Sequence, residues 1–143
     1  MKLTTKCRYG VRAVLEIAKN YNIRPTSCRE IAELQDIPES YLENILIELK
    51  RAGLIISVRG AKGGFLLNRS PSSFTMLDIV LVLQKSIVPV DCILNPKKCS
   101  KVDSCIARPL WQKMYKVQEN VLKSFTTIDL LDNQLADLDC LPI

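Results

Sequence analysis

The sequence predicts a mainly α-helical fold with a small β-hairpin: a winged helix-turn-helix domain followed by a long dimerisation helix. Three observations carry this prediction: two short helical patterns separated by a tight break, two β-rich runs around a glycine-rich loop, and a later near-heptad apolar pattern. The 143 residues, 48% of them apolar, suffice for one domain with a helical extension. We expect a DNA-binding domain at residues 1–75, a linking helix, cysteine loop and dimerisation helix at 76–130, and an acidic tail at 131–143.

Three helices are predicted in the first part of the chain. Residues 5–21 carry apolar side chains at helical spacing, and Ser27 with Glu30 forms a capping-box pattern that opens a second, short helix. Pro38 suits the first turn of a third helix, which Gly53 should end. The expected inner face of that helix is Leu42, Ile45, Leu46 and Leu49. Two short helices joined by a tight turn indicate a helix-turn-helix.

A β-hairpin and a buried helix are predicted next. Residues 54–58 and 65–67 are rich in β-formers and flank a glycine-rich loop, which is typical of a wing. Thr75 and Asp78 repeat the capping pattern before a helix that is apolar almost all round, and Pro89 is expected to stop it.

The long helix predicted after Pro109 has apolar residues at spacings of four, three and four. This seam exceeds what a small winged domain could cover, so we expect it to dimerise, with Trp111 in the dimer core. An ordinary helix packed on its own domain is the alternative. The seam consists of Leu110, Met114, Val117 and Val121, widened by Trp111, Leu122 and Phe125.

Charge is distributed unevenly along the chain. Residues 1–70 hold twelve Lys and Arg against seven Asp and Glu, a net +5, whereas residues 71–143 hold eight of each and are neutral. The basic half is therefore the candidate for a polyanionic partner. Without a signal sequence or a long apolar run we expect a cytoplasmic protein with no membrane association. With no histidine and no polar triad in the chain we expect no enzymatic activity.

The third helix and the wing carry the candidate DNA contacts. The N-terminal residues of the second helix of a helix-turn-helix meet base edges. Asn44 can pair with adenine, Glu43 can accept a hydrogen bond from the cytosine amino group, and Ser40 can hydrogen-bond to a base or a phosphate. The alternative is that these are ordinary solvated helix residues. In the wing, Arg59 beside Gly60 suits a narrow minor groove, and Lys62 could hold a phosphate.

Three cysteines lie in one polar, lysine-rich segment. Cys92, Cys99 and Cys105 are spaced C-x6-C-x5-C, which suits neither a zinc finger nor a C-x-x-C redox pair. Three thiolates on a loop suit an iron-sulfur cluster, of the two-iron or four-iron kind, and the spacing alone leaves a thiol switch equally open. Cys7 and Cys28 are expected to be small buried helix residues.

Four stretches in this order carry a family resemblance: MKLTTKCRYGVRAVLEIA, IPESYLENILIELKRAGLI, SVRGAKGGFLL and the three-cysteine loop. Together they closely resemble the bacterial winged-helix regulators typified by IscR, with relatives NsrR, RirA and CymR. The resemblance implies a homodimer on a double-stranded DNA operator, with a cluster held by the three loop cysteines whose presence or state sets which operators are bound. It also implies major-groove contacts by Ser40, Tyr41, Glu43 and Asn44, where the IscR type has glutamine in place of Asn44, and a minor-groove contact by Arg59.

The fourth cluster ligand departs from the family pattern. IscR-type proteins use a histidine at the position of Arg108, and NsrR-type proteins use a carboxylate at the position of Arg8. The remaining candidates are Cys7 of the partner, Asp91, Asp103, Cys140, and an exogenous thiol or water. Two rival functions stay open: a cluster-free regulator of the CymR kind, controlled by thiol oxidation or a partner enzyme, and an iron-sulfur carrier that kept the fold.

Overall fold

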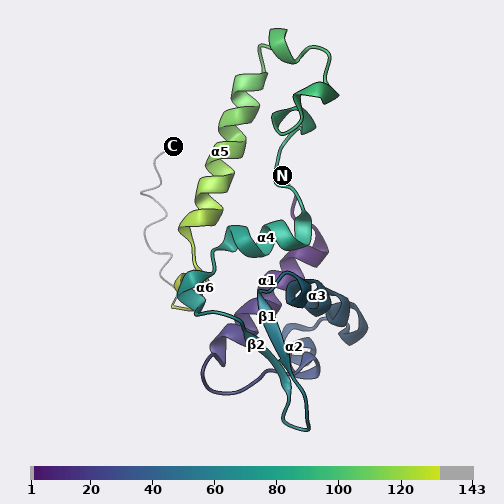
Figure 1. The fold of residues 1–143 in the computed structure, drawn as a ribbon, viewed down its shortest axis with the longest axis vertical. Coiled ribbons are helices and arrows are strands. Elements are labelled where there is room, and N and C mark those ends of the chain that lie inside the picture. The colour runs from purple at the N-terminus through teal and green to yellow at the C-terminus, as the bar shows by residue number, and fades with distance from the viewer. Residues whose placement is uncertain (1, 133–143) are drawn as a thin grey trace.

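Three helices and a hairpin form the N-terminal part of the molecule (Figure 1). The computed structural model describes residues 2–132 and contains α1 (Thr5–Lys19), α2 (Cys28–Gln35), α3 (Glu39–Arg51), β1 (Ile55–Val58) and β2 (Gly64–Leu67). The strands are antiparallel, with Ile55 opposite Leu67 and Val58 opposite Gly64. This arrangement confirms the predicted fold class, since a two-stranded wing follows a helix-turn-helix.

The turn between α2 and α3 depends on local side-chain and backbone chemistry. The Ser27 hydroxyl accepts from the Glu30 backbone N–H at 3.1 Å, as predicted, but the Glu30 carboxylate pairs with Arg24 at 2.6 and 2.8 Å. Only the Ser27 half of the predicted capping box is therefore formed, because the Glu30 carboxylate pairs with Arg24 and not with the Ser27 backbone N–H. Asp36 takes a left-handed conformation at φ 51°, which ends α2 and turns the chain into α3.

The core lies where α1, α3 and α4 (Met76–Gln84) meet. The predicted inner face of α3 is confirmed, because its four leucine and isoleucine side chains are at most 1% exposed. Each such side chain stabilises the fold by roughly 1.5–3 kcal/mol through burial. Gly53 follows α3 at φ 77°, as a helix-ending glycine should.

Helix α4 begins as predicted and ends earlier than predicted. Thr75 and Asp78 form a complete capping box, and most of the helix is buried. It ends at Gln84, followed by Lys85 at φ 64°, so the prediction that Pro89 stops it was wrong. The left-handed residue has already broken the helix several residues before the proline. Leu81 is 41% exposed, which departs from the expected all-round burial.

The cysteine segment and α5 (Arg108–Ser124) extend away from the winged part, so that the loop and the wing lie at opposite ends of the molecule (Figure 1). The loop contains three 3-10 turns, at Asp91–Ile93, Pro96–Lys98 and Val102–Ser104. None of the helices among residues 2–132 combines the length and apolar character that crossing a membrane requires.

An unpredicted helix, α6 (Thr127–Leu131), returns the chain to the winged part. Thr126 and Asp129 form its capping box, and it packs against α1 and the 3-10 turn Pro71–Ser73. Backbone bonds join it to the start of α4: Met76 N–H donates to Phe125 O at 2.8 Å, and Thr127 N–H to Phe74 O at 2.9 Å. Of the predicted acidic tail, only Leu131 and Asp132 belong to the described residues.

Candidate nucleic-acid interface and cysteine loop

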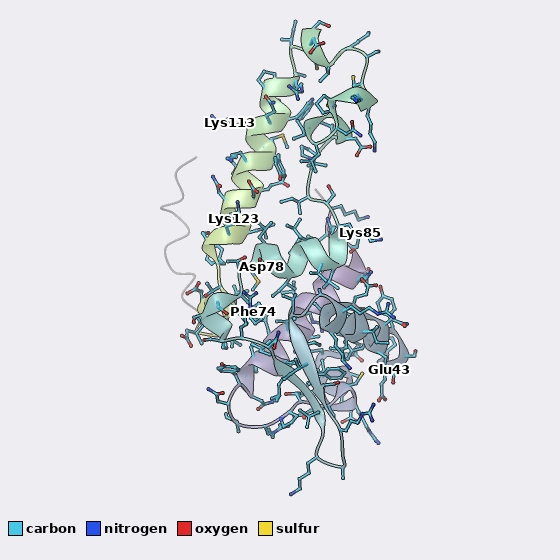
Figure 2. The ribbon with its side chains drawn as sticks, in the orientation of Figure 1. Glu43, Phe74, Asp78, Lys85, Lys113 and Lys123 are labelled. Carbon is cyan, nitrogen blue, oxygen red and sulfur yellow. The ribbon has the colours of Figure 1, made fainter. Side chains whose placement is uncertain are left out.

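Helix α3 presents a polar face to solvent on the side opposite its buried leucines. Ser40, Glu43 and Asn44 are all exposed on this face, and Figure 2 shows Glu43 projecting outward from α3. The Asn44 side-chain N–H donates to the Ser40 carbonyl at 3.2 Å. An amide nitrogen has two hydrogens, so the Asn44 amide keeps one donor and its carbonyl for another partner.

Tyr41 is oriented by a second aromatic ring. Its ring meets that of Tyr9 edge-on, with centroids 6.0 Å apart, and the Arg12 guanidinium lies 5.5 Å from the Tyr9 centroid on α1. Arg12 also donates to the Gln35 side chain at 2.7 Å and to the Gln35 carbonyl. This network ties α1 to both helices of the helix-turn-helix. Sequence reasoning missed it, because its members lie far apart in the chain and no local pattern marks them.

The wing residues predicted to contact DNA cluster at the hairpin tip. Arg59, Gly60 and Lys62 are exposed there, and Gly60 has φ 115° with open space where a Cβ would stand. Gly64 packs so closely on the Thr26 backbone that a Cβ would lie 2.5 Å from its carbonyl carbon. Thr26 and Phe65 also form an isolated β-bridge. The start of β2, next to the hairpin turn, is thereby fixed to the segment before α2, while Arg59, Gly60 and Lys62 of the turn stay exposed.

Cys28 lies beneath the acidic residues of α3. Its sulfur and the carboxylate oxygens of Glu39 and Glu43 all lie within 4.8 Å of one another. Burial, and then the charges of Glu39 and Glu43, raise the pKa of the Cys28 thiol to about 11. The thiol donates to the Glu39 backbone carbonyl at 3.9 Å. Cys28 is half-buried, and not fully buried as expected.

The three loop cysteines line one hollow beside the start of α5. They are all half-buried, and Val90, Asp91, Lys98 and Trp111 complete the lining. Trp111, which was expected in a dimer core, contributes to this hollow in the single chain. Within residues 2–132 the three sulfurs do not form a group with mutual spacing below 4.8 Å, as one shared metal ion would need. Cysteine sulfurs are the ligand type that iron-sulfur clusters use.

The candidates for a fourth cluster ligand differ in burial and in their position relative to the hollow. Cys7 is fully buried in α1 of its own chain, and burial raises the pKa of its thiol. Asp91 lines the hollow, with its carboxylate 3.0 Å from the Lys98 ammonium. Asp103 is exposed outside the lining, and Cys140 lies outside the described residues. Arg108 has a buried Nε without a hydrogen-bond partner in the described part of the chain.

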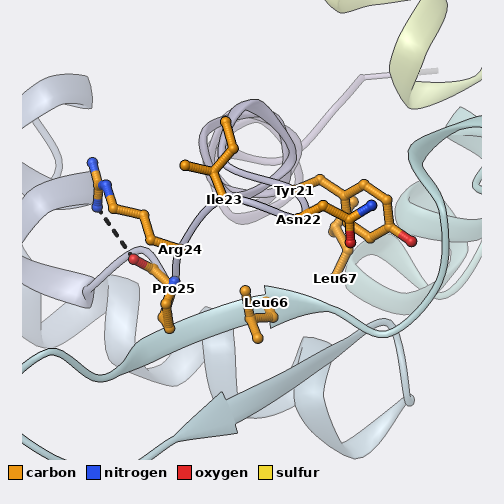
Figure 3. A pocket seen from close by; sticks show the side chains of 7 residues that line it. All are labelled: Tyr21, Asn22, Ile23, Arg24, Pro25, Leu66 and Leu67. Atoms are coloured by element: carbon orange, nitrogen blue, oxygen red, sulfur yellow. Dashed lines mark hydrogen bonds between the residues drawn. The ribbon is translucent and has the colours of Figure 1, made fainter.

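A second hollow lies between the α1–α2 connection and β2 (Figure 3). Arg24, its only charged lining residue, donates to the Pro25 carbonyl at 3.2 Å and pairs with Glu30. The lining offers no cysteine or carboxylate, and we assign this hollow no chemical role. The lining consists of Tyr21, Asn22, Ile23, Arg24, Pro25, Leu66 and Leu67.

Comparisons with known proteins agree on one family. Residues 3–133 match the family model Rrf2, described as an iron-dependent transcriptional regulator. The chain is 36% identical to protein Rrf2 of Nitratidesulfovibrio vulgaris over 131 residues, covering 92% of this chain and 87% of the relative. It is 38% identical to the regulator CymR of Bacillus subtilis, covering 91% and 89%, and 34% identical to the regulator IscR of Klebsiella pneumoniae, covering 94% and 82%.

Solved structures give the same result. CymR of B. subtilis, named the global cysteine regulator, superposes with a TM-score of 0.79 at 35% identity, covering 93% of this chain and 98% of that chain. IscR of T. potens superposes with a TM-score of 0.76 at 34% identity, covering 94% and 88%. The family match spans nearly the whole chain and the relatives cover it almost end to end. This protein therefore belongs to the Rrf2 family of transcriptional regulators.

Proposed function

We propose that this protein is a cytoplasmic, homodimeric repressor that binds a roughly palindromic DNA operator and adjusts its affinity through an iron-sulfur cluster on the cysteine loop. The hollow that the three cysteines share is the observation that carries the sensing half of this proposal. The regulators of the same family support the DNA-binding half.

The DNA contacts in this proposal come from two separate elements. Ser40, Glu43 and Asn44 would enter the major groove from the exposed face of α3, and Tyr41 would assist at its edge while held by Tyr9. The exposed wing tip, with Arg59, Gly60 and Lys62, would reach the minor groove and a phosphate. The net charge of +5 in residues 1–70 would attract DNA of any sequence.

The exposed apolar stripe on α5 supports dimerisation. No residue of α5 is buried in the single chain, and Leu110, Met114 and Val117 are 55%, 38% and 39% exposed. Tyr115 and Leu122 of α5 instead pack against the core of their own chain, as does Phe125 directly after the helix. The helix therefore has one face occupied and one face free. The free face is apolar at heptad-like spacing, and a second copy of α5 would cover it.

The cluster would be held by Cys92, Cys99 and Cys105, with Asp91 the protein group best placed to complete the set. When bound, it would supply a site whose charge and integrity respond to oxidants and to iron supply. Lys98 lines the same hollow, and its positive charge would offset part of the negative charge of thiolate ligands. The Trp111 ring would shield one side from water.

A cluster-free regulator controlled by thiol oxidation or by a partner enzyme is the second candidate. The similarity to CymR, the global cysteine regulator of B. subtilis, favours it as much as the similarity to IscR favours the first. An iron-sulfur carrier without DNA binding is a weaker candidate, because it leaves the wing tip and the polar face of α3 without a use.

Anaerobic purification tests the proposal. The protein should be coloured, contain iron and acid-labile sulfide in comparable amounts, and lose them when Cys92, Cys99 or Cys105 is replaced by alanine. Cys28→Ser is the matched control, since this cysteine lies far from the loop and should leave cluster content unchanged. Colourless protein after reconstitution, with retained operator binding, would favour the cluster-free regulator. Coloured protein with no preference among DNA sequences would favour the carrier.

A further inference from the structure

One apolar side chain stands among the polar residues of the α3 outer face. Ile47 is 45% exposed, although the four apolar residues on the inner face of the same helix are at most 1% exposed. It is absent from the residues that pack against the core. An isoleucine also forms helices less readily than the polar residues common on helix surfaces. Its presence there has no explanation in the packing of its own chain.

Helical geometry places Ile47 on the same face of α3 as the proposed DNA contacts, one turn further along the helix. At about 100° per residue, it lies about 20° around the helix from Ser40, between the directions of Glu43 and Asn44. At about 1.5 Å per residue, it lies about 4.5 Å beyond Asn44 along the axis of α3. A helix that presents Ser40 and Asn44 to the major groove would therefore present the Ile47 side chain to the same groove.

We propose that Ile47 is a further specificity-determining residue, which recognises a thymine in each operator half-site by apolar contact with its 5-methyl group. This inference rests on the proposed DNA-binding function. The thymine methyl is the apolar group that the major groove presents, and contact with an apolar side chain is its recognised mode of readout. Because isoleucine is β-branched, its χ1 angle is nearly fixed in a helix, so its methyl groups are already positioned for such a contact.

Deoxyuridine scanning of the operator tests this proposal. The full-length protein first selects its operator from random duplex DNA, and each thymine is then replaced by deoxyuridine in both half-sites. This replacement removes only the 5-methyl group. Losing one buried methyl contact should weaken binding about fourfold per half-site, from the transfer free energy of one carbon, and therefore roughly 15-fold for both half-sites.

The variant Ile47→Ala identifies which thymine the side chain meets. At one thymine position, replacing thymine by deoxyuridine should weaken operator binding by the wild-type protein roughly 15-fold. The same replacement should weaken binding by the alanine variant less than about twofold. Ile47→Val keeps the β-branched methyl groups and should retain most of the sensitivity. Ile23→Ala is the control, because Ile23 is 75% exposed outside α3, and this variant should respond to deoxyuridine as the wild type does. Since Ile47 is exposed, its variants should fold normally, which circular dichroism can check.

The possible outcomes separate this inference from the function on which it rests. If no thymine replacement weakens the wild type, or if Ile47→Ala stays as sensitive as the wild type at every position, Ile47 reads no methyl group. Either result leaves operator binding intact and overturns only this inference. If the wild-type protein selects no sequence at all, the proposed function fails together with it.

Discussion

The thiol of Cys28 should be unusually slow to react with alkylating reagents. Burial and the charges of Glu39 and Glu43 raise its pKa to about 11, against an ordinary value of 9.0. At pH 8 the thiolate fraction is then about one in a thousand instead of about one in ten, since each pKa unit is a factor of ten. Because the thiolate is the nucleophile, alkylation at pH 8 should be about 100-fold slower than for a cysteine in a short peptide.

Mass spectrometry of quenched iodoacetamide reactions measures this rate for Cys28. The rate should still rise between pH 9 and pH 11, where an ordinary thiol levels off. Glu43→Gln removes one of the two charges and should speed the reaction at pH 8, whereas Glu33→Gln, at an exposed glutamate paired with Arg29, should not. Steric shielding alone would slow Cys28 without shifting its pH profile. A profile that levels off near pH 9 would therefore refute the electrostatic explanation.

Four other variants give distinct expected results. Arg59→Ala should weaken operator binding by about 1–3 kcal/mol and relax preference at A/T-rich flanks, and unchanged affinity would contradict a minor-groove role. Leu46→Ala, at a fully buried position, should lower the free energy of unfolding by about 2–5 kcal/mol in urea titrations. Val117→Asp should produce monomers in analytical ultracentrifugation, because it puts a charge into the exposed stripe of α5. Arg24 lowers the pKa of Glu30, so this pair stabilises the fold above the unfolded pKa of Glu30 and loses its effect as pH falls through the folded value. Glu30→Gln should therefore cost less than about 1 kcal/mol at pH 7 and nothing once the pH is below the folded pKa of Glu30.

The sequence predicted those parts of the fold that local chemistry determines. Ser27 and Thr75 accept from backbone N–H groups three residues ahead, and such caps are visible in a single stretch of sequence. The inner face of α3 was equally predictable from its spacing. Helix α6 was missed, although Thr126 and Asp129 carry the same capping signature, because it is five residues long and its stability comes from packing on α1.

Contacts between distant segments could not be predicted. Arg12 reaches Gln35, and Tyr9 meets Tyr41, across stretches of chain with no shared pattern. The same limit applies to the cysteine loop. Its spacing left a cluster and a thiol switch equally open, and only the folded chain brings Cys92, Cys99, Cys105 and Trp111 around one hollow. The exposure of a side chain also depends on the fold. Ile47 differs from the other aliphatic residues of α3 in being exposed, and the sequence alone does not show this.

Helix α4 connects the proposed sensing and DNA-binding regions. Its C-terminal end leads into the cysteine loop (Figure 1). Its N-terminal end is hydrogen-bonded to the segment that follows α5, through the backbone N–H groups of Met76 and Thr127. The chain therefore runs from the C-terminal end of α4 through the cysteine loop and α5, and then back to the N-terminal end of α4. Because α4 also packs against α1 and α3, a shift of α5 relative to its own chain must be accommodated at the helix that supports α3. These helices would have two arrangements, one that binds DNA and one that does not. A ligand on the loop can change DNA affinity only if it binds these two arrangements with different affinities. Cluster affinity should therefore change on operator binding by the same factor as operator affinity changes on cluster binding.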